Sequence, residues 1–274
     1  MMDNLEHILD LLQCPECHQH PLMIVQQGSS DISLNCQACG KICRCYNGVL
    51  DLLAERDSAL VQKTMGRRKA RFYDAFFARG GFRRLYSRWR FRDEVNEFID
   101  FFDLQSEDVV LDVGCGTGNY TVEFAKKIRK GVVIGLDLSL GMLEVCEKNA
   151  HKEGVANILL LRGNAENLPF KEASLRHICL GCLCLLDDIV PSLRNAYHCL
   201  APGGILFGMS LAESETVKSR RIQKSFARVM QSYLVNRAMI EKYLKKVGFV
   251  NFEYRIEGFV GAFRAVKPNW QDIF

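Results

Sequence analysis

The stretch that constrains this chain most is an apolar run that leads directly into a glycine-rich turn, Val109-Val110-Leu111-Asp112-Val113-Gly114-Cys115-Gly116-Thr117-Gly118-Asn119. Apart from one acid, the run is apolar on both faces, which is typical of a central strand in a parallel sheet. Glycines at three alternate positions let the backbone bend tightly and approach a ligand closely, because no Cβ intervenes. We therefore expect a strand, a ligand-binding turn, and a helix over residues 120–129.

Strand and helix patterns alternate through the rest of the chain. We expect helices over 93–104, 188–200 and 236–248, and strands over 132–137, 158–161, 174–183, 205–209, 250–256 and 259–266. This alternation predicts an α/β protein with a doubly wound sheet, whose ligand lies at the carboxyl ends of the strands.

The spacing of the turn and one acid define the expected ligand. A dinucleotide fingerprint requires G-x-G-x-x-G, whereas here the glycines alternate and Asn119 follows the third. The strand over 132–137 ends in Asp137, nineteen residues past Gly118. A carboxylate at that point can accept hydrogen bonds from both hydroxyls of a ribose. The pattern therefore favours a ligand that contains a nucleoside.

These motifs together resemble class I methyltransferases that use S-adenosylmethionine (SAM), of the ubiquinone/menaquinone type, over about residues 93–267. Two further turns carry the resemblance: Gly163-Asn164-Ala165-Glu166-Asn167-Leu168-Pro169-Phe170 and Leu200-Ala201-Pro202-Gly203-Gly204. The resemblance implies a Rossmann-like seven-stranded methyltransferase sheet. The cofactor-binding residues that it implies are Asp112, Gly114, Cys115, Gly116, Gly118, Asp137, Leu138, Met142, Asn164, Ala165, Glu166 and Cys182.

The chain departs from the family pattern at two places. The family usually has an acid where this chain has Asn164, whose amide oxygen can still accept a hydrogen bond from the adenine amino group, without charge assistance. Relatives commonly have Ser-Phe-Asp at the entrance to the fourth strand, where this chain has Leu175 and Arg176 after Ser174. Cys182 is expected to line the site as a small residue, because no neighbouring base would activate it.

The first fifty residues contain two C-x-x-C pairs, Cys14/Cys17 and Cys36/Cys39, separated by eighteen residues. Four thiolates at this spacing predict a tetrahedral structural Zn²⁺ site. Fewer than sixty residues cannot build a self-sufficient core, so we expect the metal to supply much of the folding free energy. Disulfides are the alternative, and Cys43 and Cys45 are expected to pack as small apolar residues. The segment resembles the N-terminal zinc ribbons of some bacterial methyltransferases.

Composition and cysteine usage indicate a compartment. The chain of 274 residues is 48% hydrophobic and 25% charged, as in an ordinary globular protein, and no apolar run approaches the ~18 residues that a membrane span needs. Its acidic start has no signal-peptide pattern. The twelve cysteines therefore indicate a reducing compartment, and we expect a cytoplasmic protein.

Basic residues concentrate between the two predicted domains. Residues 63–92 hold eleven Lys or Arg and one acid, so the net charge of this segment is +10. The net charge of the whole chain is +4, so the remainder carries −6. Three interpretations stay open: amphipathic helices with solvated arginines, an RNA-binding strip over Arg67–Arg92, and contact with an anionic membrane surface. Helices before the first strand often cover the cofactor in the resembled family, which makes Tyr73 a candidate pocket residue.

We therefore expect a zinc ribbon over 1–55, a basic aromatic connector over 56–92 and a SAM-dependent methyltransferase domain over 93–274. The leading hypothesis is methyl transfer to a small or medium-sized acceptor. The alternatives are an RNA methyltransferase that grips RNA through the ribbon and the connector, and a SAM-binding scaffold that pairs with a protein through the ribbon. Asp187, Asp188 and Tyr73 are the candidate catalytic residues, and the sequence indicates no particular oligomeric state.

Overall fold

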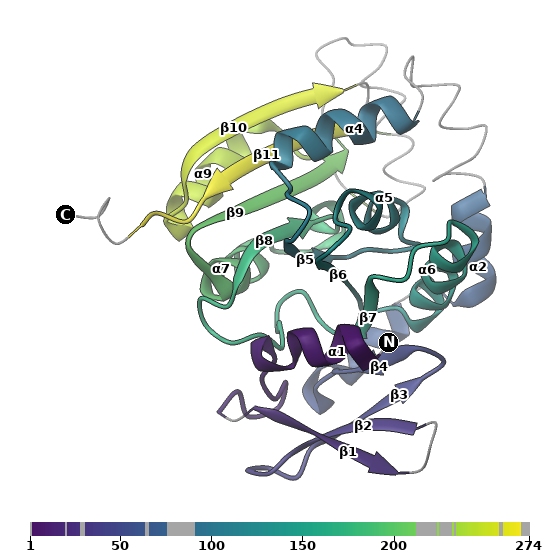
Figure 1. Cartoon of the computed structure of the whole chain (residues 1–274). Coiled ribbons are helices and arrows are strands. Elements are labelled where there is room, and N and C mark those ends of the chain that lie inside the picture. Colours follow the sequence, from purple (N-terminus) through teal and green to yellow (C-terminus); the bar gives the residue numbers. More distant parts are fainter. Residues whose placement is uncertain are drawn as a thin grey trace.

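The computed structural model describes residues 2–19, 21–27, 31–63, 66–75, 91–211, 224, 232, 234–257 and 260–269. Its central feature is a twisted sheet with helices on both faces (Figure 1). Seven strands correspond to the predicted ones, and their order is β7-β6-β5-β8-β9-β11-β10. They are β5 (Val109–Val113), β6 (Val132–Asp137), β7 (Ile158–Arg162), β8 (Leu175–Leu180), β9 (Leu200–Leu211), β10 (Val250–Glu257) and β11 (Val260–Val266).

The directions of these strands confirm the doubly wound fold. Strands β5 to β9 run parallel to one another, and β11 pairs antiparallel with both β9 and β10. The helices α4 (Phe91–Phe102), α5 (Asn119–Lys127) and α6 (Leu140–Lys152) pack on one face of the sheet. The helices α1 (Met2–Ile8), α7 (Val190–Cys199) and α9 (Arg237–Val247) pack on the other face.

The predicted apolar face of α4 forms the centre of one core. Val95, Phe98 and Phe102 are fully buried, and the Phe102 ring stacks on Phe207 of β9 at 4.8 Å between centroids. Burial of side chains of this size contributes roughly 1.5–3 kcal/mol each. This contact fixes α4 against β9, two strands away from β5 in the sheet.

Helix ends follow their capping residues. Asn236 accepts a hydrogen bond from the Met239 amide at the start of α9, and Gly248 ends that helix with a φ of 110°, as predicted. Helix α7 begins at Val190 rather than at residue 188, and its N-cap residue Ile189 makes no side-chain hydrogen bond; Pro191 lies in its first turn.

The N-terminal segment extends the sheet. Strands β1 (Leu22–Gln27), β2 (Asp31–Cys36) and β3 (Ile42–Tyr46) form an antiparallel unit, and β4 (Val49–Asp51) pairs with β3 and, in parallel, with β7. The continuous sheet therefore has eleven strands. Apolar side chains of this segment, such as Leu12 and Leu34, pack in the same core as Leu161 and Phe170. The segment thus shares a core with the rest of the protein, in addition to any stability that a metal supplies.

Several short elements were not predicted, among them α1, η1 (Leu9–Leu11), η2 (Glu55–Lys63) and η4 (Leu183–Leu185). The helical spacing of Leu5, Ile8 and Leu12, all fully buried, is the signal that would have revealed the first of them. Segment η2 is polar and has no such periodicity.

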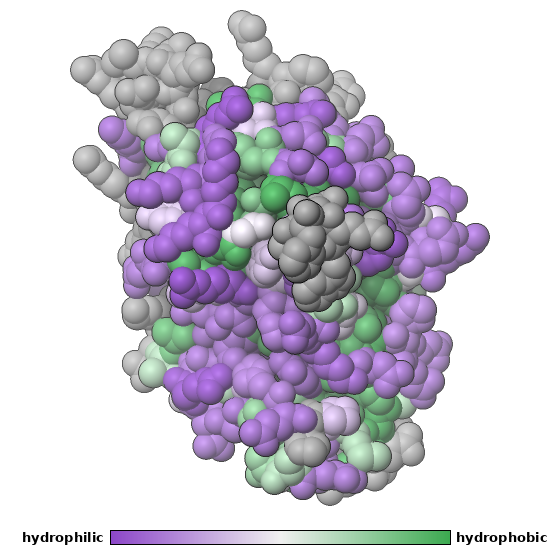
Figure 2. All heavy atoms as spheres, turned by 90° about the vertical axis from the view of Figure 1, so that its left-hand side faces the viewer, coloured by the Kyte–Doolittle hydropathy of each residue, from purple (hydrophilic) through white to green (hydrophobic). Residues whose placement is uncertain are grey.

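Part of the basic connector is described as α2 (Arg67–Tyr73), which packs on α6 with Ala70 buried against Met142 and Val145. Residues 76–90, which form a large part of the predicted strip over Arg67–Arg92, lie outside the described residues. Within the described ranges, no helix is long and apolar enough to cross a membrane. The face seen from the left of Figure 1 is mainly hydrophilic, with apolar residues scattered over it (Figure 2).

Candidate cofactor site and cysteine cluster

The glycine turn joins the carboxyl end of β5 to α5. The amides of Gly114 and Cys115 both donate to the Leu136 carbonyl of β6, at 2.7 and 3.1 Å, which holds the turn against the neighbouring strand. Gly114, Gly116 and Gly118 have φ values of 73°, 56° and 80°. These left-handed conformations cost an L-residue with a side chain about 1–2 kcal/mol each, which explains the choice of glycine.

Asp137 ends β6 directly beside this turn. Its two carboxylate oxygens accept the Gly116 amide at 2.9 Å and the Ser139 amide at 2.8 Å. Burial raises the pKa of Asp137, while the backbone donors lower it. A carboxylate has about four lone-pair sites, so acceptor capacity is left for two ligand hydroxyls. The structure therefore brings the predicted acid and the predicted turn into one site.

Asp112 lies beneath the turn, where its side chain is 3% exposed. It accepts the Thr121 hydroxyl of α5 at 2.7 Å. Burial raises the pKa of Asp112 to about 6, against the lowering effect of the Thr121 hydrogen bond. This acid ties the strand to the first turn of α5.

The two cysteines of the predicted site pack against glycines. Cys182 follows β8, and a Cβ added to Gly114 would lie 2.4 Å from its Cβ. The Cys115 side chain is buried, and Cys146 of α6 closes on Gly118 in the same way, at 2.3 Å from an added Cβ. Burial raises the pKa of the Cys182 thiol, so this side chain is neutral at pH 7 and packs as expected.

The turn after β7 holds the next group of predicted residues. Asn164 is 8% exposed, and its amide oxygen accepts the Glu166 amide at 3.0 Å. Its amide nitrogen donates to Asp57 of η2 at 3.1 Å, a contact that sequence reasoning missed. Ala165 is buried in the core, and Glu166 is exposed. Arg162 is the register partner of Asp137, so Asn164 lies next to the Asp137 edge of the sheet.

Helices α2 and α6 close another side of the site. Asp74, just past α2, accepts the Thr117 hydroxyl at 2.7 Å and the Asn149 amide nitrogen at 3.3 Å. Tyr73 packs with Met142, which is 9% exposed. The half-buried Leu138 offers its carbonyl to Arg162 at 3.3 Å. Asp74 was not predicted as a site residue, and its only sequence signal is that it is the single acid of the basic segment.

The remaining catalytic candidates follow β8. Asp187 and Asp188 are both exposed, and the Asp188 carboxylate accepts the Val190 amide at 2.9 Å. One oxygen of Asp188 is therefore already engaged by the backbone just before α7.

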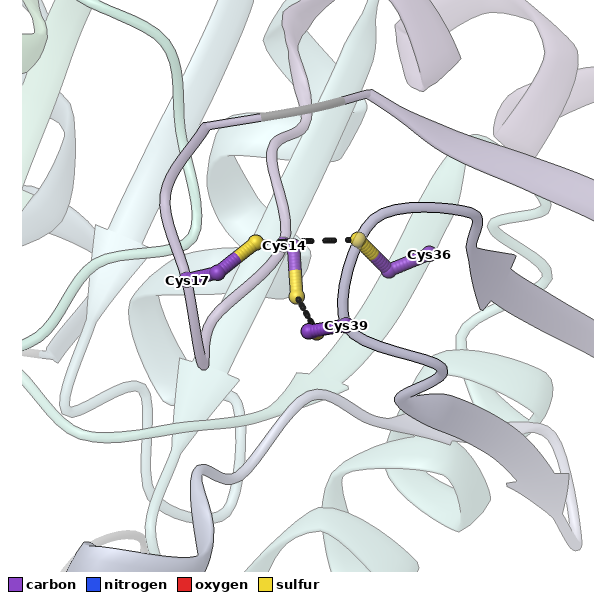
Figure 3. Close-up of side chains that lie close together, drawn as sticks. All are labelled: Cys14, Cys17, Cys36 and Cys39. Carbon is purple, nitrogen blue, oxygen red and sulfur yellow. Dashed lines mark hydrogen bonds between the residues drawn. The ribbon is translucent and has the colours of Figure 1, made fainter.

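The four predicted metal ligands converge at the N-terminal segment. The sulfur atoms of Cys14, Cys17, Cys36 and Cys39 all lie within 4.8 Å of one another, and their side chains point toward a common centre (Figure 3). Cys14–Cys39 and Cys17–Cys36 are each 3.6 Å apart. Tetrahedral Zn²⁺ with Zn–S bonds of about 2.3 Å places sulfurs about 3.8 Å apart, so the donor set fits this ion. No disulfide joins any of the twelve cysteines, and Cys43 is fully buried in the core, as predicted.

The chain is similar in sequence and in fold to known methyltransferases. Residues 110–204 match the family described as "Methyltransferase domain". A SAM-dependent methyltransferase structure from Aquifex aeolicus superposes with a TM-score of 0.58 at 17% identity, over 74% of this chain and 100% of that one. Phosphoethanolamine N-methyltransferase 2 of Haemonchus contortus, solved with S-adenosyl-L-methionine, gives 0.55 at 20% identity, over 65% and 53%. Residues 110–204 are therefore similar to methyltransferase domains, and the fold is that of the SAM-dependent methyltransferase structures.

The chain is also similar in sequence to demethylmenaquinone methyltransferases. A demethylmenaquinone methyltransferase of Geobacillus sp. is 28% identical over 156 residues, which cover 52% of this chain and 65% of that protein. One from Listeria welshimeri is 34% identical over 125 residues, covering 45% and 51%. The chain thus spans roughly half to two thirds of the length of these relatives.

Proposed function

We propose that this protein is an S-adenosylmethionine-dependent methyltransferase. The observation that carries the proposal is the pairing of the glycine turn with Asp137, whose carboxylate accepts the Gly116 amide at 2.9 Å. In this proposal the turn approaches the amino-acid part of SAM, Asp137 accepts both ribose hydroxyls, and Asn164 with Ala165 contacts the adenine. The match of residues 110–204 to the methyltransferase domain supports the same assignment.

The residues of this chain act by binding and positioning. SAM supplies an activated methyl group when bound, so the protein must align an acceptor in line and exclude water. Asp74 ties the segment after α2 to Thr117 of the turn, which places that helix as a cover beside the site. Asp137 holds the ribose edge, and the half-buried Cys182 packs against the turn. Asp187 is a better candidate base than Asp188, because the Asp188 carboxylate already accepts the Val190 amide.

The acceptor that we propose is a small or medium-sized molecule, with a quinone-like ring as the leading class. The support is the similarity to demethylmenaquinone methyltransferases, whose names state that acceptor class. The test is transfer of radiolabelled methyl from SAM into cell extract, with and without ribonuclease, followed by fractionation. Label in the organic phase is the expected result, and the absence of any transferred label would refute the proposal.

RNA is the second candidate acceptor, and one observation favours it. A hollow of about 500 Å³ between α2 and α6 is lined by Arg68, Arg71 and Lys148, which are exposed, and by Phe72, which is 63% exposed. Basic and aromatic side chains in one groove can contact phosphates and stack on bases. In the same experiment, loss of the label on ribonuclease treatment would favour this candidate.

We further propose that the cysteine cluster binds a structural Zn²⁺ and that the protein works in a reducing, cytoplasmic compartment. The second proposal is supported by the lack of disulfides among the twelve cysteines. The boundaries at about residues 55 and 92 remain part of the proposal, with the ribbon joined to the sheet through β4.

A further inference from the structure

The side chain of Asn164 raises a question that the proposed cofactor role leaves open. An amide presents an oxygen or a nitrogen to the ligand, depending on which way it is turned, whereas the acid found in the resembled family presents only oxygens. Recognition of the adenine amino group requires an acceptor. The specificity of this site therefore depends on what fixes the orientation of that amide.

The orientation of a neighbouring amide, that of Asn167, is fixed by its contacts. This residue is 8% exposed and has polar partners on both sides of its amide. Arg56 of η2 donates to its amide oxygen at 2.8 Å, and its amide nitrogen donates to the Pro15 carbonyl at 3.2 Å. A guanidinium has no acceptor and a carbonyl has no donor, so only one orientation of the Asn167 amide satisfies both. Pro15 lies between Cys14 and Cys17, so the cysteine cluster holds this end of the network.

Asp57 connects the Asn167 amide to the Asn164 amide on the cofactor side. Asp57 is also 8% exposed, and its two carboxylate oxygens accept from Asn167 at 3.0 Å and from Asn164 at 3.1 Å. A carboxylate accepts only, so the nitrogen of Asn164 must face Asp57 and its oxygen must face the other way. That oxygen already accepts the Glu166 amide at 3.0 Å, and it keeps a second lone pair.

We propose that Asp57 is a positioning residue that sets adenine specificity by holding the Asn164 amide with its oxygen toward the cofactor. The proposal rests on the proposed function, because it assigns the base-reading side of the same site. The negative charge of Asp57 on the nitrogen side also polarises the amide, which strengthens its oxygen as an acceptor. Asp57 and Asn164 together thus supply what a single acid supplies in the resembled family.

The test compares binding of S-adenosylhomocysteine with S-inosylhomocysteine, in which a carbonyl oxygen replaces the adenine amino group. Calorimetry should show that the wild-type protein prefers the adenine ligand by about tenfold or more, the effect of roughly one buried hydrogen bond gained or left unmade. Asp57→Asn removes the obligatory acceptor without changing side-chain volume and should reduce that preference severalfold. Glu55→Gln, an exposed neighbour in the same segment with the same change of charge, should retain it.

A swap of the two residues provides the rescue. N164D alone places two carboxylates side by side and should weaken binding and lower the Tm. The double variant D57N/N164D restores one donor facing one acceptor and should recover both stability and the adenine preference. This arm decides the question even if D57N alone does not fold.

The outcomes separate the two proposals. Failure of the wild-type protein to bind S-adenosylhomocysteine would refute the proposed function. Tight binding of that ligand together with an unchanged preference in D57N, or no recovery in the double variant, would overturn the role of Asp57.

Discussion

The variant Gly116→Ala distinguishes the effect of the glycine turn on stability from its effect on SAM affinity. The residue has a φ of 56°, and an added Cβ would meet no protein atom within 4 Å. Gly116→Ala should therefore cost only the left-handed backbone penalty of about 1 kcal/mol, which corresponds to a Tm lower by roughly 2–4 °C in a protein of this size. The new Cβ points into space that the proposed cofactor uses. Overpacking of about 1–3 kcal/mol predicts that SAM affinity falls roughly 5- to 150-fold.

The assay is calorimetric titration with SAM beside a thermal melt, and Gly154→Ala is the matched control. Gly154 follows α6, has a φ of 67°, and also leaves an added Cβ without a neighbour within 4 Å. Both variants should lose the same stability, and only Gly116→Ala should lose affinity. Equal SAM affinity in the two variants would show that the turn does not approach the ligand, and the cofactor assignment would be wrong.

Three further predictions follow from other parts of the molecule. Asp137→Ala removes the acceptor for both ribose hydroxyls and should weaken SAM binding about 100-fold or more, measured by calorimetry; unchanged affinity would contradict the assignment. Cys36→Ser should release zinc, measured by metal analysis, and unfold the N-terminal segment; a wild-type protein free of zinc would reject the site. Burial raises the pKa of Asp112 to about 6, so the folded state holds the proton more tightly than the unfolded state, and stability should fall as pH rises from about 4 to 6. Asp112→Asn should flatten that dependence in urea melts and raise stability at pH 7 by up to about 3 kcal/mol; an unchanged profile would contradict it.

Much of the fold was readable from local patterns. Strand β6 ends at Asp137 as predicted, and α9 lies between the predicted Asn236 cap and Gly248. Such signals depend on residues only a few positions apart, because periodicity, caps and glycine conformations are local properties of the chain. Among the elements that were missed, α1 is short, and the polar η2 has no apolar stripe to reveal it.

The residues of the candidate sites were likewise predicted only where local spacing reveals them. The glycine turn, Asp137 and the four cysteines were predicted from spacing. The structure places Asp137 beside the turn, and it places the four cysteines close to one another. Asp57 and Asp74 were not found, because each acts on a residue tens of positions away. Asp57 contacts Asn164 across 107 positions of sequence, and no local pattern encodes such a pairing.

The sequence by itself therefore determined the order of strands and helices, the ligand turn and the metal-type cysteine pairs, since each depends on neighbouring residues. Only the tertiary structure decided that β4 joins the edge of the main sheet through β7, which merges the core of the N-terminal segment with that of the larger domain. The same docking places Pro15, Arg56 and Asp57 against the turn after β7. The physical reason is that hydrogen bonds between distant segments form only when packing brings their polar groups together, and side-chain orientation is then fixed by the polarity of the partners.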